Sequence, residues 1–136
     1  MNDDALWPAF QERTLTDAEW THRTHLRVAW MHLVRWSLDE AHLRMRIGIV
    51  RLNAAHGLQE TPARGYHETL TRVWLVLVGA LRRSDPCADS QEFVERHAPS
   101  LTREAPLRHY TRERLFSLEA RAVYVAPDRE PFPDLP

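Results

Sequence analysis

The chain has 136 residues, which is enough for one domain that buries about two-thirds of its unfolded surface. Its net charge of −1 at pH 7 argues against a nucleic-acid surface, because neutralising phosphates requires a concentrated basic face. The longest apolar run is far shorter than the roughly 20 residues that span a bilayer, and the single cysteine, Cys87, excludes an intrachain disulfide, so we expect a cytoplasmic protein without membrane contact.

The predicted fold is an all-α, single-domain helical bundle over residues 1–136, with residues 1–15 as an N-terminal segment. The first long helix begins at residue 17 or 22. Thr16 and Glu19 can form a capping box before it, and Thr21 is a second possible cap. The helix is expected to end near Trp36.

Ser37 and Glu40 predict the start of a second helix over residues 38–56, which stops at Gly57. Since almost no loop separates the first two helices, we expect an antiparallel hairpin. A third helix is predicted over 66–83, and shorter helices before residue 124 close the bundle, the first of them capped by Asp89 and ended by Pro99. A proline-rich extended tail follows over about 126–136.

Four histidines are expected at one end of this bundle. His22 and His25 open the first helix, His56 ends the second, and His67 opens the third. An antiparallel second helix and a short connection bring all four together, whereas His42 lies about 21 Å from His56 along the helix axis. Imidazole binds metals and transfers protons near neutral pH, so this convergence indicates a site.

The leading interpretation of these histidines is a divalent transition metal, Zn, Fe, Cu or Ni, as cofactor. His22, His25 and His67 are the predicted first ligands, and His56 or His109 completes the set. Structural alternatives remain open. His56 beside Gly57 can simply bond the last carbonyls of its helix, and His67 in a first helical turn can be a buried, neutral hydrogen-bond acceptor.

Three further residues are candidates for catalysis. Tyr66 can supply a phenol at the mouth of the third helix. Glu68 can act as a ligand or base if this helix starts irregularly, and otherwise forms an ordinary surface ion pair with Arg72. Arg108, beside His109, can meet an anionic substrate. Trp74 is expected in the core, with contact to a substrate as the alternative.

Two strings resemble those of a small bacterial family of hypothetical proteins: Thr21-His22-x-x-His25-Leu26-Arg27-x-Ala29-Trp30 and Gly65-Tyr66-His67-Glu68-Thr69-Leu70-Thr71-Arg72-x-Trp74. Pro106-Leu107-Arg108-His109-Tyr110 and Ser117-x-Glu119-Ala120-Arg121 share this resemblance, which implies no particular activity. The architecture is also broadly similar to DinB-like metal-binding bundles, which use three histidines from different helices. This chain departs from their pattern because it lacks a late His-x-x-x-His.

These observations leave three functions open. The first is a small metal-dependent enzyme that acts on a small molecule at the histidine cluster. The second is metal-free acid–base catalysis, with His67 or His25 as the base and Tyr66 as the acid. The third is a non-catalytic helical binding or assembly module in which the histidines satisfy buried backbone groups. The expected partner is a small-molecule substrate or ligand, and the chain could assemble as a homo-oligomer.

Overall fold

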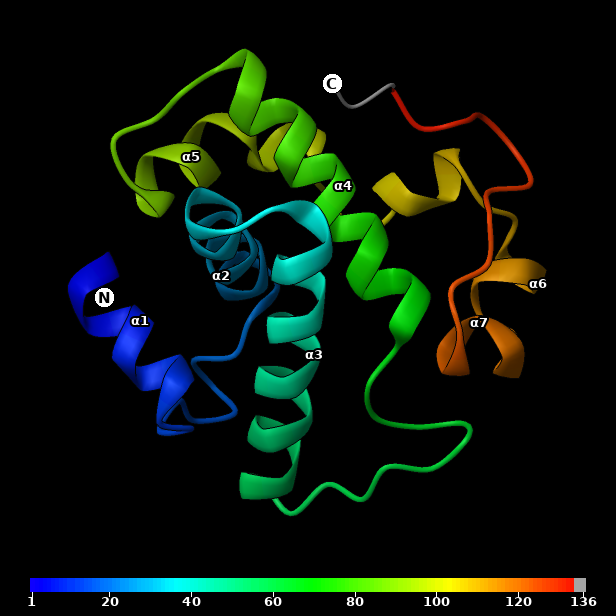
Figure 1. Ribbon diagram of the computed structural model, residues 1–136, viewed down its shortest axis with the longest axis horizontal. Helices are drawn as coiled ribbons and strands as arrows, with labels where there is room; N and C mark the ends of the chain where they lie inside the picture. Colours follow the sequence, from blue (N-terminus) through cyan, green and yellow to red (C-terminus); the bar gives the residue numbers. More distant parts are fainter. Residues whose placement is uncertain (134–136) are drawn as a thin grey trace.

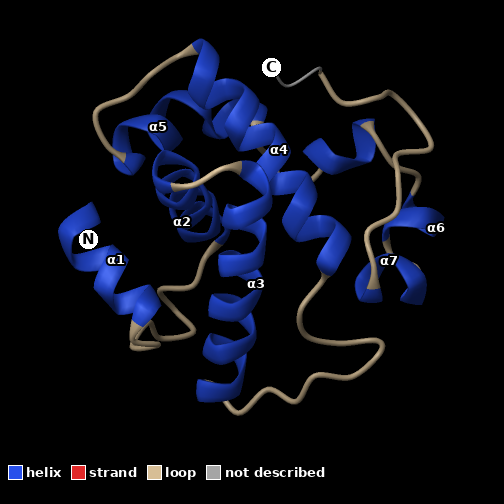
Figure 2. Cartoon of the chain, viewed as in Figure 1, coloured by secondary structure: helices blue, strands red, loops and turns tan. Residues whose placement is uncertain are grey.

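A computed structural model describes residues 1–133 of the chain. These residues form α-helices and short 3-10 turns without a β-strand, which confirms the predicted all-α class (Figure 2). The elements are α1 (Asp3–Gln11), α2 (His22–Arg35), α3 (Leu38–Ala55), α4 (Glu68–Ser84), α5 (Ser90–His97), η1 (Ala98–Ser100), η2 (Ala105–Arg108), α6 (Arg112–Leu115) and α7 (Leu118–Ala122). None of the helices among the described residues is both long and apolar enough to cross a membrane.

The helix starts follow the capping signals of the sequence. Thr21, Ser37 and Asp89 are the N-caps of α2, α3 and α5, and each side chain accepts a hydrogen bond from the backbone N–H three residues on. The earlier signal at Thr16 and Glu19 does form its reciprocal bonds, but it closes only a turn before α2. Gly57, with a φ of 76°, ends α3 as predicted.

The N-terminal segment contains a helix that the sequence patterns did not predict. Asn2 caps α1, which buries Leu6 and Phe10 in the core. The Phe10 ring lies directly on Gly48 of α3, where even a β-carbon would collide with it. Asp3 accepts bonds from Ser90 and from Arg27, which fasten α1 to α5 and α2.

The long helices cross steeply. Figure 1 looks nearly along α2, whereas α3 and α4 run across the view. The two-residue connection Trp36–Ser37 joins α2 to α3 as the sequence predicts, but the pair does not run side by side. The start of α2 therefore lies against α4 rather than against the end of α3, and this arrangement decides which histidines meet.

Two apolar clusters hold the molecule together. The larger one contains residues of α1 to α5 and Leu101, and it includes Trp30 and Phe93. The smaller one lies on the other side of α4, where α6 and α7 are drawn in Figure 1. Its buried members are Val73, Tyr110, Leu115, Ala120 and Val125.

The C-terminal segment after α7 has no helix over residues 123–133, and residues 134–136 of the predicted extended tail lie outside the described part. The segment is held by hydrogen bonds rather than left loose. Tyr110 donates its hydroxyl proton to the Val125 carbonyl (2.7 Å), and Thr69 bonds both the Val123 carbonyl and the Val125 N–H. These bonds close the smaller cluster.

Candidate functional site

A pocket of about 490 Å³ lies between the start of α2, the second half of α3 and the start of α4. Three of the predicted metal ligands, His22, His25 and His67, line it together with Tyr66. Its volume lies in the range of about 300–1,000 Å³ that is common for small-molecule sites. We call it the histidine pocket; its other lining residues are Trp20, Ile49, Asn53, Leu58, Gly65, Leu70, Thr71, Trp74, Arg103, Leu115 and Phe116.

His25 is the histidine of this pocket with the most unusual environment. Its Nδ1–H donates to the Thr21 carbonyl one turn earlier (2.7 Å), and its ring lies 3.7 Å from the ring of Trp20. Burial lowers the pKa of His25 to about 4, and the charges of His22 and Arg103 act in the same direction. The ring is therefore neutral at pH 7. Its Nε2 is a hydrogen-bond acceptor without a partner among the described residues.

His22 has one ring nitrogen engaged. Its Nε2–H donates to the Leu101 carbonyl at 2.7 Å, which ties the start of α2 to the chain after η1. The edge of its ring meets the indole of Trp74, with the ring centres 4.9 Å apart. Within the described part of the chain, Nδ1 of His22 makes no hydrogen bond, so His22 and His25 each retain one nitrogen for a ligand.

His67 is fully engaged in holding the fold. It is the N-cap of α4 rather than a residue of its first turn, so this helix begins two residues later than predicted. Its Nδ1 accepts the Leu70 N–H (3.0 Å), and its Nε2–H donates to the Leu115 carbonyl (2.8 Å). Burial lowers the pKa of His67, in keeping with a neutral ring. Both nitrogens are occupied, so a metal would have to displace one of these bonds.

Tyr66 and Glu68 belong to a polar network beside the pocket. The Tyr66 hydroxyl donates to Glu68 (2.6 Å), and His42 donates its Nε2–H to the same carboxylate oxygen (2.7 Å). Arg46 of α3 also bonds Glu68, whereas Arg72 bonds Asp39 instead of Glu68. The predicted Glu68–Arg72 surface pair is therefore wrong, because the carboxylate of Glu68 turns toward α3.

This network resists proton transfer. The Tyr66 pKa is raised above its ordinary value by burial and by the hydrogen bond to Glu68, and the pKa of Glu68 is lowered through its bonds to Tyr66, His42 and Arg46 despite its burial. A phenol that holds its proton and a carboxylate that is already saturated with donors are poor acids and bases near pH 7. The network joins α3 to the start of α4, and of its members Tyr66 lines the histidine pocket.

His56 lies away from the pocket lining. Its Nε2–H donates to the Leu15 carbonyl (2.7 Å), and its Nδ1 lies 2.8 Å from the Asp17 carboxylate. Because α2 and α3 cross, the end of α3 meets the segment before α2 rather than His22 and His25. His56 thus connects two segments that are far apart in the sequence.

His109 and Arg108 lie at a different cavity, of about 820 Å³, between the end of α4, the η turns and the C-terminal segment. His109 donates its Nδ1–H to the Glu130 carbonyl (2.7 Å), and exposed Arg108 lies 3.7 Å from the Glu130 carboxylate. The structure therefore does not bring the two residues to the histidine pocket. The direction of the chain after Pro99 could not be predicted from helical periodicity, since short 3-10 turns and irregular segments follow this residue.

The five predicted metal ligands do not assemble around one point. Among the described residues, a group of three histidine, cysteine or acidic ligand atoms within 4.8 Å of one another is formed elsewhere, by Asp85, Cys87 and His97. In the histidine pocket, a cation could be held by the free nitrogens of His22 and His25, which lie on one helix at positions i and i+3.

Sequence reasoning missed Arg103 and Trp20. Arg103 is exposed at the rim of the pocket, where its charge helps to lower the pKa of His25, and it forms no ion pair within residues 1–133. It lies in the irregular segment between η1 and η2, where helical periodicity gives no orientation. Trp20 lies just before α2, outside the helical pattern. The signal that could have revealed its role is its position five residues before His25.

Comparisons of the chain with protein-family models, with curated proteins and with solved structures find no match.

Proposed function

We propose that the protein binds a small organic acid with an apolar body in the histidine pocket. The observation that carries this proposal is His25, a neutral imidazole held in a fixed tautomer that offers its Nε2 as an unpaired acceptor. A pocket-lining acceptor without a partner among the described residues favours a ligand that supplies a hydroxyl or N–H group. This proposal keeps the metal-free interpretation of the histidine cluster but assigns the cluster to ligand binding rather than to catalysis.

The walls of the pocket support the apolar part of such a ligand. Trp20, Trp74 and aliphatic side chains such as Leu70 form a large apolar part of the lining. Burying apolar surface contributes about 25 cal/mol for each Å² removed from water, so these walls favour a ligand with a hydrocarbon or aromatic body. A few fixed polar groups then set its orientation.

Arg103 supports the proposal that the ligand carries an acidic group. Its guanidinium group is always charged, and its planar donors match a carboxylate in a bidentate manner. Arg72, which lines a different cavity, already bonds Asp39. Arg103 has its charge available at the rim of the pocket, so an anionic ligand would gain its counter-ion there.

A panel of small carboxylates with matched neutral amides tests the proposal. Benzoate, phenylacetate and 4-hydroxybenzoate are titrated against their amides, and binding is followed by NMR shifts of the His25 and Trp74 resonances. We expect the acids to bind more tightly than the amides. Replacing Arg103 with Ala should weaken the binding affinity for the acids by about tenfold or more, which corresponds to about 1.4 kcal/mol of binding free energy. Arg108→Ala, an exposed arginine outside the pocket, is the matched control.

Two results would contradict the proposal. One is equal binding of acids and amides, which would remove the role of Arg103. The other is binding of 4-hydroxybenzoate, whose hydroxyl can donate to His25 Nε2, that His25→Ala leaves unchanged, because the unpaired acceptor would then have no part in it. Circular dichroism of each variant shows whether the fold is intact.

A metal-dependent enzyme is the second candidate, favoured by one observation: His22 and His25 each retain a ring nitrogen on the same helix face. Two imidazoles and solvent would give an open coordination sphere of the kind that catalytic metals use. Ni²⁺ or Zn²⁺ should then shift the NMR resonances of the His25 ring, and His22→Ala should abolish the shift. Resonances of His25 that do not respond to either ion would exclude the pocket as a metal site.

A further inference from the structure

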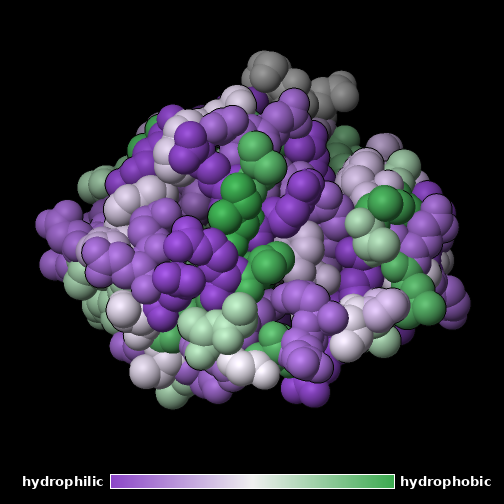
Figure 3. Space-filling model, turned by 60° about the horizontal axis from the view of Figure 1, so that its bottom comes forward, coloured by the Kyte–Doolittle hydropathy of each residue, from purple (hydrophilic) through white to green (hydrophobic). Residues whose placement is uncertain are grey.

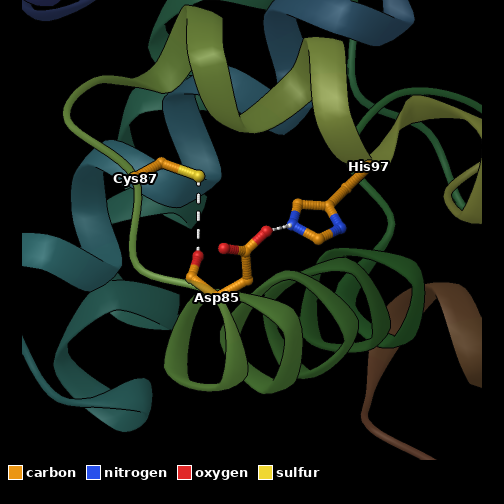
Figure 4. A group of neighbouring side chains, drawn as sticks. All are labelled: Asp85, Cys87 and His97. Carbon is orange, nitrogen blue, oxygen red and sulfur yellow. Dashed lines mark hydrogen bonds and ion pairs between the residues drawn. The ribbon is translucent and has the colours of Figure 1, made fainter.

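Three side chains of different metal-binding types meet where α4 passes into α5 (Figure 4). Asp85 is the C-cap of α4, Cys87 lies in the connection, and His97 is the last residue of α5. Their ligand atoms all lie within 4.8 Å of one another, and Asp85 Oδ2 is 2.9 Å from His97 Nε2. The group is separate from the histidine pocket, since none of its residues lines that pocket.

We propose that Asp85, Cys87 and His97 form a binding site for a divalent cation of the zinc class. Thiolate, imidazole and carboxylate are the ligands that Zn²⁺ takes in proteins, at distances of about 2.0–2.3 Å. A tetrahedral ion with these bond lengths separates its ligand atoms by less than about 4 Å. The three groups therefore need only small side-chain movements to close on one ion, and a fourth position stays open to solvent.

The neighbouring Arg96 does not block such an ion. Its guanidinium donates to Asp85 Oδ1 (2.7 Å), to Glu92 (2.7 Å) and weakly to Cys87 Sγ (3.7 Å), whereas Oδ2 is the oxygen that faces His97. A thiolate can accept this weak bond and still bind an ion through another lone pair. The carboxylate can bind a metal through Oδ2 and keep its bond to Arg96 through Oδ1. Hydrogen bonds of this kind orient ligating carboxylates in metal sites. Glu92 and Asp85 together offset the charge of Arg96.

The proton balance of binding follows from the hydrogen bonds. The Cys87 thiol donates to the Asp85 carbonyl (3.5 Å), so it carries its proton in the metal-free protein, and coordination releases this proton to solvent. The His97 Nε2–H now donates to Asp85, and its proton moves to Nδ1 when Nε2 binds the ion. Binding one ion thus releases one proton per chain. Affinity should rise with pH.

The position of the site defines what the ion would do. All three ligands lie within 13 positions of one another, and they connect the end of α4 to the end of α5. An ion there would hold the connection 85–89 to both helices and add its binding free energy to the folded state. The open fourth position leaves the ion accessible to an exchangeable ligand.

Cobalt substitution tests the site, because thiolate-bound Co²⁺ has a near-ultraviolet charge-transfer band that histidine sites lack. The untagged, reduced full chain is titrated with Co²⁺. We expect one Co²⁺ per chain with this band, its displacement by Zn²⁺, loss of the band in Cys87→Ser, and affinity weakened about tenfold or more in His97→Gln. His25→Ala is the matched control and should keep the band, which separates this site from the histidine pocket.

The proposal would be overturned by the absence of the band in a folded wild-type protein. It would also be overturned if His97→Gln bound Co²⁺ with unchanged affinity, since Cys87 alone would then account for the band. Circular dichroism of both variants confirms that the fold is kept.

Discussion

Each of the eight histidines donates a ring N–H to an acceptor within the chain, and this common role explains why they are so conspicuous in the sequence. Six donate to backbone carbonyls and two to carboxylates. The residues are His22, His25, His32, His56, His67, His109, His42 and His97.

His32 makes stability depend on pH. It is 1% exposed, and burial lowers its pKa from 6.5 to about 4. Between pH 6.5 and 4 the His32 ring takes up a proton in the unfolded chain but not in the folded chain. The contribution of the neutral ring to the free energy of unfolding is therefore fully present at pH 7 and decreases as the pH falls. We expect His32 to account for a loss of roughly 2–3 kcal/mol between pH 7 and 4.5, measured by urea unfolding.

His32→Gln is the test of this assignment, because glutamine can still donate to the Val28 carbonyl that Nδ1 now bonds. The variant should show a shallower pH dependence by about one proton. An unchanged slope would place the titration on other groups.

At the scale of helices, capping residues could be predicted and chain direction could not. The helix ends predicted at Ser37, Gly57 and Asp89 are correct because they depend on local backbone geometry. Ser37 and Asp89 each accept the backbone N–H three residues on, and Gly57 has a positive φ. The start of α4 was missed by two residues, since His67 is an unusual cap whose role depends on Leu115, far along the chain. α1 was missed because its burial depends on Gly48, which a local pattern does not reveal.

The direction of the helices, which the sequence does not predict, also explains which histidines reach the histidine pocket. His22, His25 and His67 reach one pocket because they open α2 and α4, which pack against each other. His56 does not, because the crossing of α2 and α3 turns the end of α3 toward Leu15. A crossing angle arises from how side chains interlock between helices, and the hydrophobic pattern of one helix does not contain it.

Replacing His67 with Ala tests the capping role. The change removes the cap of α4 and leaves the buried Leu115 carbonyl without its donor, so we expect a loss of about 2–4 kcal/mol in the free energy of unfolding. His67→Asn should recover about 1 kcal/mol of this, because asparagine is itself a good N-cap. Equal stability of the two variants in chemical denaturation would show that the cap contributes little.

At the scale of the whole molecule, α4 is shared by two cores of unequal size. The larger core takes α1 to α5, and the smaller one depends on the C-terminal segment that Tyr110 and Thr69 hold. Apolar side chains also remain on the surface of this smaller part, as Figure 3 shows at the side where α6 and α7 lie. Those exposed there are Phe116, Leu118, Val123 and Tyr124. The two parts should differ in local stability.

Tyr110→Phe measures that difference. The substitution deletes the hydroxyl that bonds the Val125 carbonyl and should cost about 1–2 kcal/mol. We expect faster hydrogen exchange at the Val125 amide, which Thr69 now protects, and unchanged exchange at Val78 in the larger core. Acceleration at both amides would mean that the molecule opens as a single unit.

The contact between Trp20 and His25 places a fluorescent indole beside the histidine that carries the proposed function. The indole lies between the imidazole, at 3.7 Å, and the ring of Phe10, at 5.4 Å. A protonated imidazole quenches indole fluorescence by accepting an electron from the excited ring, whereas a neutral one quenches it far less. Burial lowers the pKa of His25 to about 4, so we expect Trp20 to escape this quenching in the folded protein at pH 7. A molecule that enters beside this pair changes that emission, so the protein carries its own optical signal of occupancy.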